Sequence, residues 1–289
     1  MKVGVVGNPR YADLRSVLRE LRALAPARKI ELLSEPSLAP LWDEVLPTLD
    51  RERPDALITF GGDGTLLRGA RLLHGEEVPI LGINLGRVGF LTTATLEQIP
   101  SALDALVSGR YVLERRLALQ AMIISDTGGV RSEQRALNDI SIHKAGVARV
   151  VRIRVSVDDE ELGPYSADGV VVASPTGSTA YSLSAGGPIL SPAVEAMIVT
   201  PICAHTLAVR PIVVPPDATI CAEAFLPGAD DLLVSYDGQL GTTLAPGDRV
   251  YVRRSPSCVM LIRLGEAGYF TRMRQKLNWG DLSEREIIR

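Results

Sequence analysis

The hydrophobic periodicity of the chain changes near residue 96, and this change constrains the fold more than any other feature of the sequence. In the first part, short apolar runs of strand length alternate with helical patterns, and these runs lie at 2–6, 30–33, 56–60 and 78–83. One helical face is marked by apolar residues spaced i, i+3, i+4 and i+7, namely Leu14, Val17, Leu18 and Leu21. Such a βαβ rhythm is typical of a mainly parallel sheet with helices on its faces. The sequence therefore predicts an α/β domain over residues 1–96.

A helical pattern at 96–108 ends at Gly109, and the hydrophobic patterns that follow it are those of β-strands. Residues 151–157 alternate strictly between apolar and polar side chains, so that a strand buries its aliphatic face and exposes its arginines. Gly and Pro turns separate further β-rich segments, which lie at 169–173, 212–214, 232–236, 249–252 and 259–262. We predict a larger, all-β, sandwich-like domain over residues 97–265. The charged tail is predicted to be helical from Phe270, and residues 266–289 are predicted to pack back on the first domain.

Composition narrows the class of protein. Hydrophobic residues make up 46% of the 289 residues and charged residues 22%, which is ordinary for a soluble globular protein. The net charge of −3 lacks the basic excess that nucleic-acid binders carry, so no nucleic-acid partner is expected. The apolar stretch at 196–209 is shorter than the roughly 20 residues of a membrane span, and the N-terminus has no signal-peptide pattern. We expect a cytoplasmic protein with no membrane partner.

The cysteines argue against a zinc site and against a disulfide framework. Cys203, Cys221 and Cys258 are odd in number, widely spaced and never paired as C-x-x-C. With three histidines in the chain, a transition-metal centre has few ligands to draw on. We expect three buried, free thiols.

The turn at 61–65 (Gly-Gly-Asp-Gly-Thr) carries the first candidate site. It lies between a buried strand and a helix predicted to begin near Thr65, at the carboxyl end of a parallel sheet, where ligands bind in open α/β folds. Its three glycines let the backbone reach positive φ angles and let a phosphate approach the main chain. The helix N-terminus attracts anions, and Arg68, one turn later, can contact a phosphate or a ligand hydroxyl.

Asp63 needs its own explanation, because a carboxylate repels phosphate. It can bind Mg²⁺, or it can accept the proton of a hydroxyl that attacks phosphorus. As a purely structural residue it can instead cap the helix. The turn does not match a Walker A loop, and the chain lacks the H-R-D and D-F-G elements of protein kinases. Several kinase families share the motif, so it indicates phosphoryl transfer without naming the acceptor.

Two further segments have the composition of a nucleotide pocket. Residues 168–188 run from a strand into small and hydroxyl-bearing residues with one aromatic, Tyr181, which can pack against a planar ligand. A Ser/Thr/Gly-rich surface loop is the structural alternative. Asn138 and Asp139 stand at the entrance of an apolar-alternating strand, where they can bind ribose hydroxyls or an adenine edge. They can equally form a β-turn.

The three motifs, in this order, resemble those of the NAD kinase family. That family carries G-G-D-G-[TNS], then N-[ED], and then D-G followed by T-P-T-G-S-T-A-Y-S-L-S-A-G-G-P. The resemblance extends to residues 86–91 and 237–239, and it covers most of the chain from Gly61 onward. It implies a kinase that transfers the γ-phosphate of ATP to the 2′-hydroxyl of the adenosine ribose of NAD, giving NADP.

The resemblance also implies roles for individual residues. Asp63 is expected to be the general base that takes the proton from the 2′-hydroxyl, and base catalysis of this kind is worth about 10²- to 10⁴-fold in rate. Asn138 and Asp139 are expected to hold the adenosine side of the dinucleotide. The other expected NAD contacts are Gly64, Arg68, Arg149, Asp168, Thr179, Ala180, Tyr181, Ser182, Leu183, Ser184 and Gln239. Ser166 departs from the family, in which some members have a basic residue at this position.

Cofactors and partners follow from the same resemblance. ATP and Mg²⁺ are expected, with the ion on the phosphates as in other phosphoryl transfers, but the sequence identifies neither a separate ATP signature nor the metal ligands. Some family members use polyphosphate as the donor, and the sequence leaves the donor open. The family forms homodimers or homotetramers in which a neighbouring subunit completes part of the pocket, so Asp168 can serve a partner's site.

Two alternative functions compete with this one. A lipid kinase of the diacylglycerol type shares the first motif, but the polar stretch at 176–182 disfavours a lipid acceptor. A catalytically silent NAD-binding regulator would have no need of the base, and Asp63 is present.

Overall fold

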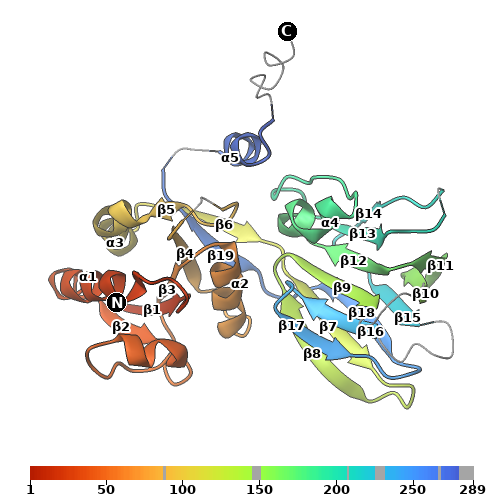
Figure 1. The fold of residues 1–289 in the computed structure, drawn as a ribbon, viewed down its shortest axis with the longest axis horizontal. Helices are drawn as coiled ribbons and strands as arrows, with labels where there is room; N and C mark the ends of the chain where they lie inside the picture. The colour runs from red at the N-terminus through yellow and green to blue at the C-terminus, as the bar shows by residue number, and fades with distance from the viewer. Residues whose placement is uncertain (87–88, 145–150, 207, 225–231, 266–267, 280–289) are drawn as a thin grey trace, which may run out of the picture. The chain divides into compact units, whose positions relative to one another are not determined.

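The computed structural model describes residues 1–86, 89–144, 151–206, 208–224, 232–265 and 268–279 (Figure 1). The chain forms two compact units: the first combines Met1–Arg115 with Met260–Arg289, and the second is Arg116–Val259. The first contains a parallel-rich sheet with helices, and the second contains two antiparallel sheets. The predicted fold class, an α/β domain plus a larger all-β sandwich, is confirmed.

The first unit is built on a seven-stranded sheet in the order β2-β1-β3-β4-β19-β6, with β5 beside β4. The pairs β1–β2, β1–β3, β3–β4, β4–β5 and β4–β19 are all parallel. The strands are β1 (Lys2–Gly7), β2 (Glu31–Ser34), β3 (Ala56–Phe60), β4 (Pro79–Asn84), β5 (Ala94–Thr95), β6 (Val112–Arg116) and β19 (Val259–Arg263). All of β3 and nearly all of β4 are buried, as is usual for parallel strands covered on both faces.

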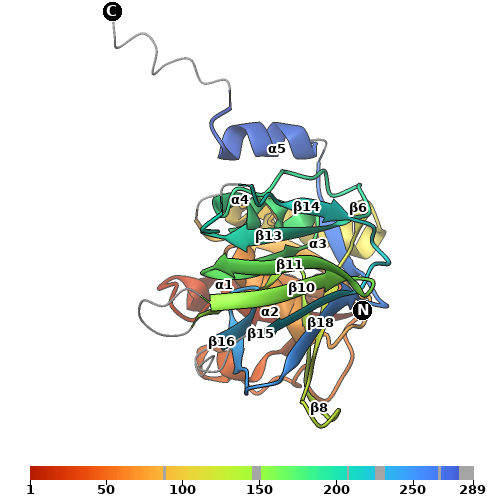
Figure 2. The same cartoon turned by 90° about the vertical axis from the view of Figure 1, so that its right-hand side faces the viewer.

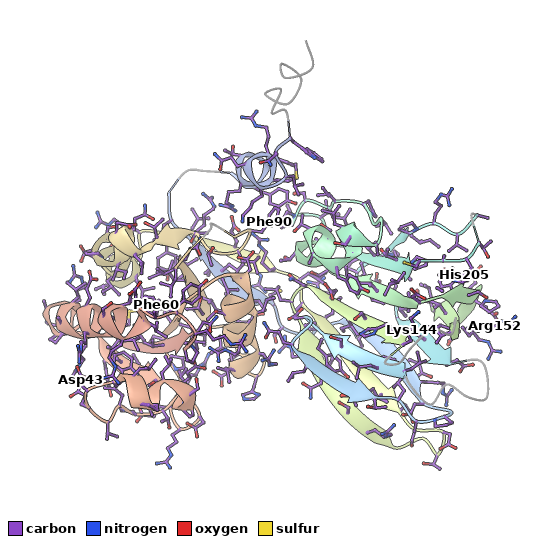
Figure 3. All side chains as sticks on the ribbon, viewed as in Figure 1. Asp43, Phe60, Phe90, Lys144, Arg152 and His205 are labelled. Atoms are coloured by element: carbon purple, nitrogen blue, oxygen red, sulfur yellow. The ribbon has the colours of Figure 1, made fainter. Side chains whose placement is uncertain are left out.

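Helices cover both faces of this sheet. On one face, α1 (Leu14–Leu24) and α3 (Ile99–Ser108) share a core with Ile58 and Phe60 of β3, and the four predicted apolar positions of α1 are buried there. On the other face, α2 (Asp63–Leu72) lies close to β3, because Gly69 faces the side chains of Leu57 and Thr59. Phe60 is labelled in Figure 3. Short 3-10 helices complete the connections: η1 (Pro26–Arg28), η2 (Pro36–Leu41) and η3 (Leu96–Gln98).

Two segments predicted for the β-rich domain lie in the first unit instead. α3 contributes Ile99 and Leu103 to the same core as α1, and β19 pairs in parallel with β4. The chain therefore divides at 115/116 and 259/260, whereas the predicted boundaries were 96/97 and 265/266. A short apolar run has the same composition in either kind of sheet, so its partner strand cannot be identified from periodicity alone. Within the tail the structure describes one helix, α5 (Tyr269–Lys276); the packing of 266–289 stays a prediction.

The second unit consists of two six-stranded sheets whose strand pairs are antiparallel. The first sheet has the order β11-β10-β15-β18-β7-β8, from β7 (Leu119–Ile124), β8 (Val130–Ala136), β10 (Val151–Val157), β11 (Glu160–Ala167), β15 (Ile220–Ala224) and β18 (Arg249–Arg254). The second has the order β14-β13-β12-β9-β16-β17, from β9 (Asp139–Lys144), β12 (Gly169–Ala173), β13 (Met197–Ile202), β14 (Ile212–Val214), β16 (Leu232–Tyr236) and β17 (Leu240–Thr243).

Side chains from both sheets form one core between them, as in a sandwich. In β10, Ile153 and Val155 point into this core, whereas Arg152 is exposed (Figure 3) and Arg154 pairs with Glu223. The outer face of the second sheet carries a smaller apolar cluster. η4 (Thr176–Thr179) and α4 (Tyr181–Ser184) follow β12 and pack against it, and Figure 2 shows α4 beside β13. The candidate nucleotide segment therefore lies on the outer face of this sheet.

Two expectations from composition can be compared with the structure. The cysteines are free, but Cys203 is exposed and Cys221 and Cys258 are half-buried, so the prediction of burial is wrong. Cys203 lies in a bend directly after β13, at a positive φ of 48°. Within the described ranges, no helix has the length and apolarity to cross a membrane.

Candidate functional site

Asp63 begins α2, and the backbone of a neighbouring loop holds its carboxylate. Oδ2 accepts the N–H of Phe90 at 2.8 Å, and Oδ1 accepts those of Leu91 at 3.0 Å and Thr92 at 3.3 Å. The carboxylate does not cap its own helix, whose N-cap residue is Gly62 and has no side-chain cap bond. The helix begins two residues earlier than predicted. Capping therefore does not explain why the turn contains an aspartate.

Two glycines make room for this arrangement. At Gly61, where φ is 156°, a Cβ atom would lie 2.2 Å from Thr65 Oγ1. At Gly89, a Cβ atom would lie 1.9 Å from Asp63 Oδ1. Gly62 has a φ of −90°, so the positive φ expected of the motif is adopted at Gly61. Gly64 is exposed in the first turn of α2.

Arg68 forms an ion pair with a buried acid. Its Nη2 donates to Glu35 Oε1 at 2.9 Å and to the Gly7 carbonyl, and Glu35 also accepts the Gly7 N–H at 2.9 Å. Glu35 is 3% exposed, so these hydrogen bonds take the place of water around its side chain. A guanidinium has five N–H donors, and the expected contact of Arg68 with a ligand stays a prediction. Glu35 was not predicted, because an acid after an apolar run has no distinctive sequence signal.

In the second unit, Asp237 holds the Asn138–Asp139 pair. Its carboxylate accepts the N–H groups of Leu137 at 3.0 Å, Asn138 at 2.7 Å and Asp139 at 3.2 Å. Asp237 and Gly238 have φ angles of 51° and 63° in the turn between β16 and β17, as expected for an Asp-Gly hairpin turn. That hairpin signal could have placed Asp237 on a turn, but not beside residues a hundred positions earlier.

The turn after β12 packs directly on Asn138. The Ser174 N–H donates to the Asn138 carbonyl at 2.9 Å, and the Gly177 N–H donates to Ser174 Oγ at 3.1 Å. A Cβ atom at Gly177 would lie 1.9 Å from the Asn138 carbonyl oxygen. Residues 174–178 are buried, so this part of the motif is not a surface loop.

Asp139 is a buried carboxyl, 5% exposed, at the first position of β9. Burial raises its pKa from 3.8 to about 7, the negative charge of Asp237 adds to the rise, and the backbone N–H of Tyr181 opposes it. Near neutral pH the Asp139 carboxyl therefore changes between a hydrogen-bond donor and an acceptor-only group.

Asp139 is expected to make the protein less stable as the pH rises from about 4 to about 7. Over this interval the unfolded chain releases the proton of Asp139 while the folded chain retains it, which costs up to about 4 kcal/mol over three pKa units. Asp139→Asn cannot ionise and removes this loss. When thermal midpoints are measured across this interval, the midpoint of the variant minus that of the wild type should increase as the pH rises. Above about pH 7 this difference should stay constant. Parallel pH profiles would contradict the assignment.

Tyr181 opens α4 and is 41% exposed, which leaves its ring available to a ligand. Burial raises the pKa of its hydroxyl, and the charges of Cys203, Asp139 and Asp168 add to this. Ser182 is buried, and its Oγ lies 2.9 Å from Thr200 Oγ1, so its hydroxyl supports α4 on β13. The remaining residues predicted in this segment are half-buried or exposed, namely Thr179, Ala180, Leu183 and Ser184.

Asp168 joins β11 to β12 and forms an ion pair with Lys144 Nζ at 2.7 Å. Lys144 ends β9 (Figure 3) and was not predicted. Gln239 lies in the β16–β17 turn, where its N–H donates to the Tyr236 carbonyl at 3.0 Å. Arg149 lies outside the described residues. In the second unit, Tyr181 thus lies near Asp139, which follows Asn138, and near Asp168. In the first unit, Asp63, Gly64 and Arg68 all lie on α2.

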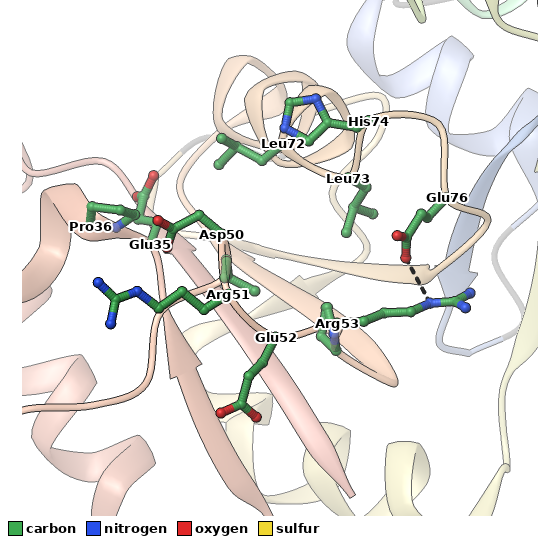
Figure 4. Close-up of a pocket in the computed structure, with 12 residues that line it drawn as sticks. Glu35, Pro36, Asp50, Arg51, Glu52, Arg53, Leu72, Leu73, His74 and Glu76 are labelled. Atoms are coloured by element: carbon green, nitrogen blue, oxygen red, sulfur yellow. Dashed lines mark ion pairs between the residues drawn. The ribbon is translucent and has the colours of Figure 1, made fainter.

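The first unit also has a pocket of about 430 Å³ beside the end of α2 (Figure 4). Its lining includes Arg51, Arg53 and His74, and Arg53 is paired with Glu76 at 2.7 Å. None of the predicted site residues lines it, although it reaches Glu35, the partner of Arg68. In the part of the chain that the structure describes, no group of three or more His, Cys, Asp or Glu side chains could hold a metal ion.

Comparisons with known proteins agree with the motifs over nearly the whole chain. Residues 4–111 match the model of the ATP-NAD kinase N-terminal domain, and residues 137–264 match that of the ATP-NAD kinase C-terminal domain. The chain is 47% identical over 289 residues to the NAD kinase of Gemmatimonas aurantiaca, an alignment that covers 99% of each chain.

Solved structures are similar as well. Yeast NADH kinase in complex with NADH has a TM-score of 0.87 and 28% identity, over 97% of this chain and 88% of that one. An NAD kinase from Archaeoglobus fulgidus in complex with ATP has a TM-score of 0.74 and 27% identity, over 96% of this chain and 99% of that one.

Proposed function

The chain belongs to the NAD kinase family, and we propose that it transfers the γ-phosphate of ATP to the 2′-hydroxyl of the adenosine ribose of NAD, forming NADP. The observation that carries this proposal is the Asp63 carboxylate, held by backbone amides at the start of α2 in a glycine turn. A carboxylate at this place can accept the proton of an attacking hydroxyl, whereas it repels a phosphate.

Asp63 acts in this proposal as the general base. As the bond between the 2′-oxygen and the γ-phosphorus forms, the hydroxyl proton passes to the carboxylate, and ADP leaves with the electrons of the broken P–O bond. Within the described residues, Oδ2 accepts one backbone N–H bond and Oδ1 accepts two. A carboxylate oxygen can accept two bonds, so Oδ2 retains a lone pair for this proton.

The NAD contacts belong to the same proposal. Asn138 and Asp139 bind the adenosine part through hydrogen bonds, and Tyr181 packs against it with its exposed ring face. Asp237 supports this role of Asn138 and Asp139, because its carboxylate accepts the N–H groups of both residues and of Leu137 before them. The further contacts proposed are Gly64, Arg68, Arg149, Asp168, Thr179, Ala180, Ser182, Leu183, Ser184 and Gln239.

Mg²⁺ is proposed to accompany ATP. Mg²⁺ in kinases is usually held by substrate phosphates, water and one or two carboxylates, and the same is proposed here. When bound there, it offsets the negative charge of the phosphates. A homodimeric or homotetrameric assembly and a cytoplasmic location are part of the same proposal.

The wild-type protein is expected to form NADP from NAD, ATP and Mg²⁺. Donor and acceptor should be varied together, with ATP or polyphosphate as donor and NAD, NADH or a diacylglycerol as acceptor, and products separated by chromatography. Phosphorylation of the lipid but not of the dinucleotide would favour the lipid kinase. NAD binding without product from either donor would favour the silent regulator, and both outcomes would overturn the proposal.

A further inference from the structure

We infer that residues Gly89–Thr92 form a clamp that positions the Asp63 carboxylate for proton transfer, an inference that rests on the proposed function. Three consecutive backbone N–H groups, at Phe90, Leu91 and Thr92, converge on this one side chain. Because they engage both carboxylate oxygens, they restrict the rotation of the carboxylate as well as its position. A single donor would leave it free to turn.

The clamp is itself anchored to the sheet. Thr92 is 1% exposed, and its Oγ1 accepts the Gly89 N–H at 3.1 Å. This hydrogen bond joins the first and the last residue of the clamp. The next residue, Thr93, donates its N–H to the Gly82 carbonyl of β4 at 3.0 Å and its hydroxyl to the Ile262 carbonyl of β19 at 3.0 Å. The donors are therefore fixed to two strands of the sheet.

The fit of the clamp leaves no space for a side chain at Gly89. A Cβ atom there would lie 1.9 Å from Oδ1, 2.5 Å from Cγ and 2.7 Å from Oδ2 of Asp63. All three are atoms of the carboxylate, so any side chain at this position must displace the base. Gly86, in the same loop, differs: its Cβ atom would meet a single neighbour, the Tyr11 hydroxyl, at 3.7 Å.

Positioning of this kind matters for phosphoryl transfer, in which catalysis depends mainly on placement and electrostatic stabilisation. A base must lie within about 2.6–3.2 Å of the atom whose proton it takes. A displacement of about 1 Å can cost about 10²-fold in rate. Gly89 and Thr92 thus act through Asp63 as positioning residues.

The test is a comparison of Gly89→Ala with Gly86→Ala in the full-length protein. Gly89→Ala should lower kcat about 10²-fold with little change in the KM for NAD or ATP, and Gly86→Ala should keep both constants. Thr92→Val, which removes the hydroxyl that accepts the Gly89 N–H, should lower kcat less, and Thr92→Ser should restore it. In an Asp63→Asn background, Gly89→Ala should cause no further loss, because its effect passes through the base.

A readout that needs no activity separates the clamp from the proposed function. In the unliganded protein, Asp63→Ala should speed hydrogen exchange at the amides of residues 90–92 by about tenfold, and Gly86→Ala should not. An unchanged or raised kcat in Gly89→Ala, or unchanged exchange in Asp63→Ala, would overturn the clamp. A wild-type protein that lacks kinase activity but shows the exchange effect would overturn the proposed function and the catalytic role, leaving the contact itself in place.

Discussion

Replacing Asp63 by asparagine is expected to lower kcat for NADP formation by about 10²- to 10⁴-fold, the range that a positioned general base contributes. The amide cannot take the proton of the 2′-hydroxyl, yet it has nearly the same shape as the carboxylate. The KM for NAD and for ATP should change little, since the lost interaction belongs to the transition state. Steady-state kinetics measures kcat and both KM values when NAD and ATP are varied in turn, each at a saturating level of the other substrate and of Mg²⁺.

The same substitution tests the hydrogen bonds around Asp63. One carbonyl oxygen remains to accept the N–H groups of Leu91 and Thr92, but the amide nitrogen cannot accept the N–H of Phe90. That lost acceptor should cost about 1–3 kcal/mol of unfolding free energy, which urea titration detects while circular dichroism shows an intact fold. Wild-type turnover in the folded variant would refute the general-base role.

Replacing Gly177 by alanine is expected to lower kcat/KM for NAD by about 10²-fold, because the new methyl group collides with backbone rather than with a movable side chain. The Cβ atom would lie 1.9 Å, 2.3 Å and 2.7 Å from the O, C and Cα atoms of Asn138. Either Asn138 or the turn after β12 must move, and both carry proposed NAD contacts. Overpacking of this kind should also cost about 1–3 kcal/mol of unfolding free energy.

The matched control for this variant is Gly129→Ala in the same unit. There a Cβ atom would meet a single neighbour, Ser125 Oγ, at an ordinary 3.5 Å. Equilibrium dialysis with NAD, in parallel with kinetics, separates lost binding from lost turnover. If Gly177→Ala bound NAD as the wild type does, the prediction that the close packing of this turn on Asn138 shapes the NAD site would be wrong.

The elements of the first unit could be predicted best where the local signal was strong. The apolar face of α1 and the buried run of β3 both match their predicted positions, because periodicity and burial follow directly from the order of residues. β19 could not be placed, since its parallel partner β4 lies some 180 residues away in the chain and leaves no local trace. α3 was predicted in the second domain, because the residues of α1 that share its core also lie far away in the chain.

The candidate site, too, could be predicted only in part. Residue types that carry the chemistry, Asp63 and the Asn138–Asp139 pair, could be identified from their motifs. The residues that hold them in place could not be identified in this way. The side chains of Asp237 and Thr92 accept backbone N–H groups that only the fold brings to them. Glu35 is distinctive only because it is buried. The roles of the motif residues themselves stay predictions until variants are measured.

The return of the chain to the first sheet at β19 has a consequence for synthesis. The whole second unit is inserted between β6 and β19, two neighbours in one sheet. During translation, the nascent N-terminal segment therefore has a vacancy between β4 and β6 until the ribosome has added the last strand. The first sheet can therefore be completed only after the whole inserted unit has been synthesised, and no single cut in the gene separates the two units.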